Sequence, residues 1–183
     1  MMFFVGGVRS GKSRLAEQWI EEASPERLYL ATARPTDAEM AARIEAHRAS
    51  RKQNWKCLES CLYPEEDLRN FLESHPGFHG AILFDCLSTW LANLLELEAP
   101  KPEIMDRAVS FLKWFSGLPL PCAIVSLECG LGFVPMSGLA RSFGDILGLI
   151  NQESARLSVG VVLVHCGLPL WLKGHPTAEI ERR

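Results

Sequence analysis

Near the start of the sequence the chain reads Gly6-Gly7-Val8-Arg9-Ser10-Gly11-Lys12-Ser13. This run has the spacing G-x-x-x-x-G-K-S, which is typical of a loop that binds the phosphates of ATP or GTP. The glycines let backbone amides turn toward an anion, Lys12 adds a positive charge for the outer phosphates, and the Ser13 hydroxyl can ligate Mg²⁺. We therefore predict that all eight residues bind nucleotide, that Lys12 is also catalytic, and that Ser13 is a metal ligand.

The residues on either side of this motif support the interpretation. Residues 2–5 form a short apolar run that is typical of a buried strand. After the motif, Leu15, Ala16, Trp19 and Ile20 recur with helical spacing. A helix that begins at the end of the loop directs the positive end of its dipole toward the same phosphates. This strand, loop and helix order argues against a chance match to the motif.

Apolar runs alternate with helical patterns along the rest of the chain. We expect further strands near 28–31, 55–58, 81–85, 123–127 and 161–164, the last being the final clear strand. Strands that are apolar throughout and alternate with helices imply a mostly parallel sheet with helices on both faces. The predicted fold class is therefore an α/β P-loop NTPase. We predict one domain over 1–183, with a helical excursion around 35–63.

A helix start is expected at the beginning of that excursion, in residues 35–39. Thr36 can accept a hydrogen bond from the third helical amide while Glu39 reaches back, which is the capping-box arrangement. The helix then places His47 on its apolar stripe. A neutral imidazole is a good nucleophile and can form a covalent intermediate. Histidines on such a stripe are also commonly packed or exposed without a role, so spacing alone leaves both readings open.

Polar residues and a glycine follow several of the predicted strands. Gly6, Thr32, Asp85, Glu128 and His165 all fall near carboxyl ends, where parallel sheets bind their ligands. The Asp85 carboxylate can hold Mg²⁺ through water, as the second acidic motif of P-loop proteins does, although aspartate is also common in turns. Glu128 precedes a glycine-rich turn and could orient a nucleophile or a metal-bound water, or be an ordinary loop acid.

Composition narrows the partners and the compartment. The formal net charge of the 183 residues is -3, so we expect no nucleic-acid partner. No apolar run is long enough to cross a bilayer, so no integral membrane segment is expected. No secretory leader is expected either, because the motif begins at Gly6. Six cysteines without a C-x-x-C pair, most in or beside apolar runs, favour small hydrophobes in a reduced, cytoplasmic chain over a zinc site.

Several stretches together resemble one family, the bifunctional adenosylcobinamide kinase/adenosylcobinamide-phosphate guanylyltransferases of cobalamin nucleotide-loop assembly. The resemblance runs from about Phe3 to about Lys173. The segment E-M-x-x-R-I-x-x-H is far more specific than the P-loop, which many proteins share. Besides the P-loop, the matching stretches are Asp37–Arg48, Leu83–Leu95, Gly130–Pro135, Asn151-Gln152 and Gly167–Leu170.

The resemblance implies two reactions. One phosphorylates the aminopropanol hydroxyl of adenosylcobinamide with ATP or GTP. The other moves GMP from GTP onto that phosphate, releasing pyrophosphate and giving adenosylcobinamide-GDP. The resemblance also implies that His47 carries the guanylyl group, that the sheet is RecA-like, and that the protein is a homotrimer. Further nucleotide contacts are predicted at Thr32, Arg48, Glu59 and Asp85, and Mg²⁺ is expected at Ser13 and Asp85.

The chain departs from the family's usual pattern in four places. Asn-Glu is replaced by Leu127-Glu128, Arg-Asp by Gly144-Asp145, Arg-Pro by Arg51-Lys52, and a valine by Cys129. Loss of an amide and a guanidinium could remove hydrogen bonds to nucleotide or substrate. Two alternatives therefore stay open: a single-activity P-loop small-molecule kinase with His47 idle, and a nucleotide-responsive binding module without transfer chemistry.

Overall fold

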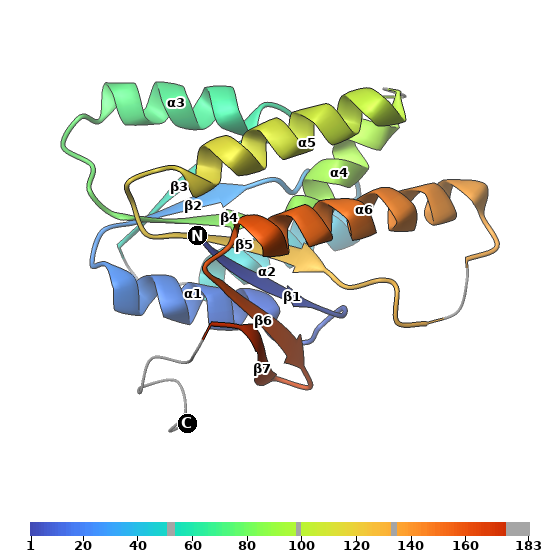
Figure 1. Ribbon diagram of the computed structural model, residues 1–183. Helices are drawn as coiled ribbons and strands as arrows, with labels where there is room; N and C mark the ends of the chain where they lie inside the picture. The colour runs from blue at the N-terminus through green and yellow to red at the C-terminus, as the bar shows by residue number, and fades with distance from the viewer. Residues whose placement is uncertain (51–53, 98–99, 133–134, 175–183) are drawn as a thin grey trace.

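The protein is built around one seven-stranded sheet. The structure is a computed structural model that describes residues 1–50, 54–97, 100–132 and 135–174 (Figure 1). Its strands are β1 (Met2–Gly6), β2 (Arg27–Ala31), β3 (Trp55–Glu59), β4 (Ala81–Asp85), β5 (Cys122–Leu127), β6 (Gly160–His165) and β7 (Leu168–Lys173). Its helices are α1 (Lys12–Ala23), α2 (Ala38–Ser50), α3 (Pro64–Ser74), α4 (Leu87–Glu96), α5 (Lys101–Ser116) and α6 (Gly138–Leu157).

The strands lie in the order β3-β2-β4-β5-β1-β6-β7. All neighbouring pairs are parallel except β6 and β7. Helix α1 packs on one face, and α3, α4, α5 and α6 cover the other (Figure 1). The predicted mostly parallel sheet with helices on both faces is thereby confirmed. That the whole chain is one domain stays a prediction.

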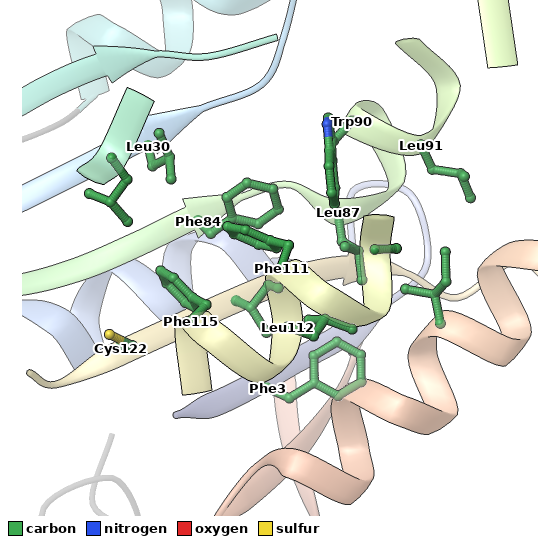
Figure 2. Packing of buried hydrophobic residues seen from close by; sticks show 14 of the residues in the cluster. Phe3, Leu30, Phe84, Leu87, Trp90, Leu91, Phe111, Leu112, Phe115 and Cys122 are labelled. Atoms are coloured by element: carbon green, nitrogen blue, oxygen red, sulfur yellow. The ribbon is translucent and has the colours of Figure 1, made fainter. Parts of the chain in front are cut away.

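Helices cover both faces of the sheet, so the apolar strand residues are buried against apolar helix faces and form a core on each side. Figure 2 shows its aromatic centre, in which Phe84 of β4 lies against Phe111 and Phe115 of α5. The ring centroids of Phe84 and Phe111 are 4.8 Å apart, and those of Phe111 and Phe115 are 5.3 Å apart. Burying each ring stabilises the fold by roughly 1.5–3 kcal/mol. This packing fixes the strand ends that form the site.

The expectation that residues 161–164 form the last strand is wrong. Strand β7 follows β6 in antiparallel register, joined by a tight turn at Cys166 (φ 52°) and Gly167 (φ 81°). Positive φ at both turn residues is what a two-residue hairpin needs. Pro169 argues against a strand when the sequence is read alone, but a strand at the edge of a sheet tolerates proline.

The capping prediction for α2 is also wrong in its residue. The Asp37 carboxylate accepts a hydrogen bond of 2.7 Å from the backbone N–H of Met40, and the helix begins at Ala38. Asp37 is therefore the N-cap, one residue later than Thr36. Both residue types cap helices well, so the sequence pattern could not separate two neighbouring candidates.

The cysteines are only partly the small hydrophobes expected. Cys122 is buried in β5, whereas Cys57, Cys129 and Cys166 are exposed, so the burial prediction is wrong for these three. None of the six cysteines forms a disulfide. Within the described residues, no group of three or more potential metal-ligating side chains occurs. None of the helices in these ranges is both long and apolar enough to span a bilayer.

Candidate functional site

The phosphate-loop backbone is fixed by the centre of the sheet. Strand β1 pairs with β5 on one side and β6 on the other, and the loop begins where β1 ends. A Cβ at Gly6 would lie 2.3 Å from the Val164 carbonyl oxygen, so only glycine fits there. Gly11 has φ 93°, a conformation that L side chains rarely adopt. The two glycines are thus required by geometry and set the path of the loop.

Hydrogen bonds hold the rest of the loop. The Ser10 N–H donates to the Gly7 carbonyl at 3.2 Å, and the Gly167 N–H of the β6–β7 turn donates to the Ser10 carbonyl at 2.9 Å. The Lys12 ammonium donates to the Gly7 carbonyl at 3.1 Å, so its charge lies over the loop. Helix α1 begins at Lys12 with no acidic residue in its first turn. The helix end therefore favours an anion.

A cavity of about 650 Å³ opens beside this loop. A volume of this order suits a nucleotide-sized ligand. The P-loop forms one wall, α2 and the end of β3 form another, and the end of β4 with the start of α4 forms the floor. The residues that line the cavity are Val8, Arg9, Ser10, Gly11, Lys12, Ser13, Arg14, Tyr29, Ala31, Ala33, Met40, Ile44, Ala46, Arg48, Cys57, Glu59, Asp85, Cys86, Ser88, Thr89 and Leu127.

The carboxylate at the end of β4 is oriented by a tyrosine. The Tyr29 hydroxyl donates a 2.7 Å hydrogen bond to Oδ2 of Asp85, and both residues line the cavity together with Ser13. Hydroxyl and carboxylate oxygens are the ligands that Mg²⁺ prefers, with water completing the shell. Sequence reasoning missed Tyr29. The available signal was a tyrosine in a strand between leucines, in a β2 that neighbours β4.

Thr32 lies behind the cavity and does not line it. Its side chain is fully buried, and its hydroxyl both donates to the Cys86 carbonyl and accepts from the Cys86 N–H, each at 2.9 Å. The Asn93 amide donates to the Thr32 carbonyl at 2.9 Å. Thr32 therefore fixes the backbone that follows Asp85, which is a positioning role in place of the direct nucleotide contact predicted for it.

The start of α4 adds cavity residues that the sequence did not suggest. Cys86 is the N-cap of α4, and its sulfur lies 3.1 Å from the Ser88 hydroxyl and 2.9 Å from the Thr89 hydroxyl. Burial, with a smaller contribution from the Asp85 carboxylate, raises the pKa of the Cys86 thiol. The thiol is therefore neutral, and it serves to orient two hydroxyls beside the phosphate loop. The sequence did not indicate this polar turn, because Cys86, Ser88 and Thr89 stand in the largely apolar stretch Leu83–Leu95.

Helix α2 reaches the cavity through Ala46 and Arg48. The Arg48 guanidinium pairs with the Glu59 carboxylate at the end of β3, so the two predicted nucleotide contacts contact one another. The backbone of His47 lies in α2 between these cavity-lining residues. The side chain of His47 is outside what the structure describes, so its orientation is not part of this geometry.

Glu128 and His165 stand outside the cavity wall. The Glu128 N–H donates to the Gly6 carbonyl at 3.0 Å, which joins the start of the β5–α6 loop to the P-loop. Its carboxylate accepts from the Gly130 N–H at 2.5 Å and is turned toward its own loop. His165 is exposed at the end of β6. The catalytic role predicted for Glu128 thus has no support from a contact in the cavity.

Three of the departures from the family pattern lie at the end of β5 or beyond it. Leu127 lines the cavity, and its carbonyl accepts from the Asn151 amide at 3.1 Å. A Cβ at Gly144 would lie 4.0 Å from the Cys129 sulfur, so these two departures face each other. The fourth, Arg51-Lys52, lies outside the described residues. The substitutions therefore alter one local region beside the P-loop.

Comparison with protein families gives a match along nearly the whole chain. The model of the family described as cobinamide kinase / cobinamide phosphate guanyltransferase matches residues 2–172. The chain belongs to this family. The bifunctional adenosylcobalamin biosynthesis protein CobP of Pseudomonas aeruginosa is 40% identical over 172 residues, covering 94% of this chain and 96% of the relative. CobU of Escherichia coli K12 is 34% identical over 185 residues, covering 94% and 99%. The resemblance seen in the sequence is confirmed.

Solved structures agree on the fold. A prototypical ATPase of a bacterial type III secretion system superposes with a TM-score of 0.59 at 11% identity, over 88% of this chain and 50% of that chain. A KaiC-like protein of Pyrococcus horikoshii gives a TM-score of 0.54 at 10% identity, over 88% and 69%. At such identities the likeness concerns the fold alone, and it confirms the P-loop ATPase architecture.

Proposed function

We propose that this chain phosphorylates adenosylcobinamide with ATP or GTP and then transfers GMP from GTP to the resulting phosphate. The observation that supports this most directly is the single cavity whose walls are the P-loop and α2. The phosphate-binding loop and the helix that contains His47 both line this cavity. Family membership supplies the substrate class.

In the proposed kinase step, the protein mainly neutralises charge. The amides of the P-loop and the Lys12 ammonium bind the outer phosphates of the donor. Ser13 and Asp85, which line the same cavity, would hold Mg²⁺, which spreads the charge of the transferring phosphoryl group. The aminopropanol oxygen of the corrinoid attacks the γ-phosphorus, the bond to the β-phosphate oxygen breaks, and the hydroxyl proton leaves to solvent or to a base.

In the proposed guanylyl transfer, an imidazole nitrogen of His47 attacks the α-phosphorus of GTP and pyrophosphate leaves. An oxygen of cobinamide phosphate then attacks the same phosphorus and releases His47. The attacking nitrogen must be unprotonated, which an unperturbed imidazole mostly is above about pH 6.5. Arg48 and Glu59, at the cavity wall, would exchange part of their ion pair for contacts with the nucleotide.

Further parts of the proposal rest on the family resemblance and on composition. We place the enzyme in the cytoplasm as a homotrimer, without a nucleic-acid partner. Six cysteines that form no disulfide fit a reducing compartment. The departures near Leu127 keep a single-activity kinase as the second candidate, because they alter the cavity wall itself.

The test is the intact mass of the protein after incubation with GTP and Mg²⁺. Wild type should acquire an acid-labile GMP adduct, and His47→Ala should not. His79→Ala is the matched control, because this exposed histidine lies before β4 and away from the cavity. It should be guanylylated as the wild type is.

Other outcomes separate the candidates. Cobinamide phosphorylation without any adduct on wild type would favour the single-activity kinase. Binding of GTP without adduct or phosphorylation would favour a nucleotide-responsive module. Unchanged nucleotide affinity in Lys12→Ala would contradict the P-loop assignment itself.

A further inference from the structure

A phosphate loop must turn its carbonyl groups away from the anion that its amides bind. The peptide bond is planar and trans, so the C=O and the N–H of one peptide unit point in opposite directions. Whatever holds a loop carbonyl therefore also directs the N–H that follows it. In this protein the carbonyls of Gly6, Gly7 and Ser10 in the P-loop each accept a hydrogen bond.

The Ser10 carbonyl is held from outside the loop, by the β6–β7 hairpin at the edge of the sheet (Figure 1). The Gly167 N–H in the hairpin turn donates to it at 2.9 Å. The two segments are in close contact, since a Cβ on Gly11 would lie 3.4 Å from the Cα of Gly167. The turn opens the family-like stretch Gly167–Leu170, which neither proposed reaction step uses.

This hydrogen bond sets the direction of the next amide. Because the Ser10 carbonyl points toward the hairpin, the Gly11 N–H of the same peptide unit points away from the hairpin. Gly11 lines the nucleotide cavity. Within the part of the chain that the structure describes, its N–H donates to no other group. A backbone amide without a protein acceptor at the start of a helix is a ready partner for a phosphate oxygen.

We infer that Gly167 is a positioning residue for the phosphates of the nucleotide. Gly167 does not line the cavity. It holds the peptide between Ser10 and Gly11 in the orientation in which the Gly11 amide can bind phosphate. Gly167 has φ 81°, which glycine adopts without strain. A Cβ there would meet only Nη2 of Arg14, at 3.9 Å. Backbone conformation, and not lack of space, therefore restricts this position.

The inference rests on the nucleotide-binding part of the proposed function and is independent of the acceptor. Its consequence is that the two ends of β7 differ in importance. A substitution that changes the turn at Gly167 should weaken nucleotide binding, although the residue lies outside the cavity. A substitution that strains the far end of the same strand should weaken the hairpin and leave nucleotide binding unchanged.

The test measures the dissociation constant for GTP by equilibrium dialysis, in wild type and in Gly167→Val. A β-branched residue does not hold positive φ, so the turn must change and release the Ser10 carbonyl. The dissociation constant should rise by about tenfold or more, as the loss of one hydrogen bond to a charged phosphate predicts. Gly167→Asn should restore binding to within about twofold of wild type, because asparagine tolerates this conformation.

Gly174→Val is the matched control. Gly174 has a similar φ of 77°, and its Cβ would lie 3.1 Å from the Val159 carbonyl oxygen. It follows Lys173, at the end of β7 farthest from the turn. The thermal unfolding temperature should therefore fall in both valine variants, whereas the affinity for GTP should fall only in Gly167→Val. That split separates positioning of the P-loop from a general weakening of the hairpin.

Unchanged GTP affinity in Gly167→Val would overturn the inference, and so would an equal loss of affinity in Gly174→Val or in Gly167→Asn. If Gly167→Val does not fold, Gly167→Ala takes its place in the comparison with Gly167→Asn, with a smaller loss expected in the same direction. If wild type binds GTP without forming an adduct or phosphorylating the corrinoid, the proposed function fails while the affinity comparison still decides the inference. If wild type does not bind GTP, both fail.

Discussion

The two walls of the cavity are held in place by different means. The P-loop begins at the end of β1, whose five residues are all buried between β5 and β6. Helix α2 stands on the opposite side, and none of its described side chains is buried. It is held by the Asp37 cap and by the exposed ion pair of Arg48 with Glu59. One wall is part of the core, and the other is attached at the surface.

This difference corresponds to the chemistry proposed for each wall. A phosphate loop must present its amides in fixed directions, since pre-organised donors need no rearrangement during the reaction. A helix that carries a guanylyl group must face two different reaction partners in succession. Weak surface attachment allows such a helix local rearrangement at little free-energy cost. Four predictions test whether the two walls differ in this way.

The largest effect is expected from Gly6→Ala. The added methyl would lie 2.3 Å from the Val164 carbonyl oxygen, a backbone atom of β6 that cannot turn aside as a flexible side chain can. We expect a loss of about 3 kcal/mol or more in the free energy of unfolding, measured with urea. Gly7→Ala is the control, because its Cβ would meet nothing within 4 Å. Equal destabilisation by both would contradict the idea of a rigid loop frame.

The next effect concerns the buried thiol of Cys122, with the exposed Cys57 as the comparison. Burial raises the pKa of the Cys122 thiol in β5 from 9.0 to about 12. The neutral thiol therefore contributes stability below pH 9, and this contribution is lost as pH rises toward 12. The loss amounts to at most about 4 kcal/mol. Wild type should lose stability more steeply over this range than Cys122→Ala in urea titrations. Cys57→Ala, at the exposed edge strand β3, should keep the wild-type slope; a wild-type slope in Cys122→Ala would refute the assignment.

A smaller effect is expected from Asp37→Ala. Removing an N-cap costs about 1 kcal/mol of helix stability. Because α2 is attached at the surface, this cost should appear as faster amide exchange within α2, with little change in the global unfolding free energy. Thr36→Ala is the control and should leave exchange unchanged. If the whole cost of about 1 kcal/mol instead appeared in the global free energy of unfolding, α2 would belong to the cooperative core.

The smallest effect on stability is expected from Glu59→Gln. An exposed ion pair contributes about 0–1 kcal/mol, so thermal unfolding should hardly change. The guanylylation rate should nevertheless change, because Arg48 and Glu59 both line the cavity. The control is the ion pair between Arg69 and Glu65 on α3, because neither of these residues lines the nucleotide cavity. Glu65→Gln should alter neither quantity.

Sequence reasoning succeeded where the determinants are local. The P-loop motif encodes its own backbone path, and apolar runs reveal buried strands. It failed where a partner distant in sequence decides. Tyr29 orients Asp85, and Thr32 binds the Cys86 backbone, because β2 and β4 are neighbours in the sheet. Strand β7 was missed because Pro169 and an exposed leucine face weaken the usual pattern of a buried strand.

The strand order has a consequence for how the protein is made. Residue 2 of β1 pairs with residue 123 of β5 and residue 160 of β6. The P-loop is synthesised before either of the strands that flank β1, because β5 and β6 come more than a hundred residues later in the sequence. Until they arrive, the Gly6 carbonyl has no β5 partner and the Ser10 carbonyl has no hairpin turn to bind. A nascent chain therefore cannot hold a nucleotide, and occupancy by GTP during translation would report that the last strands have emerged and folded.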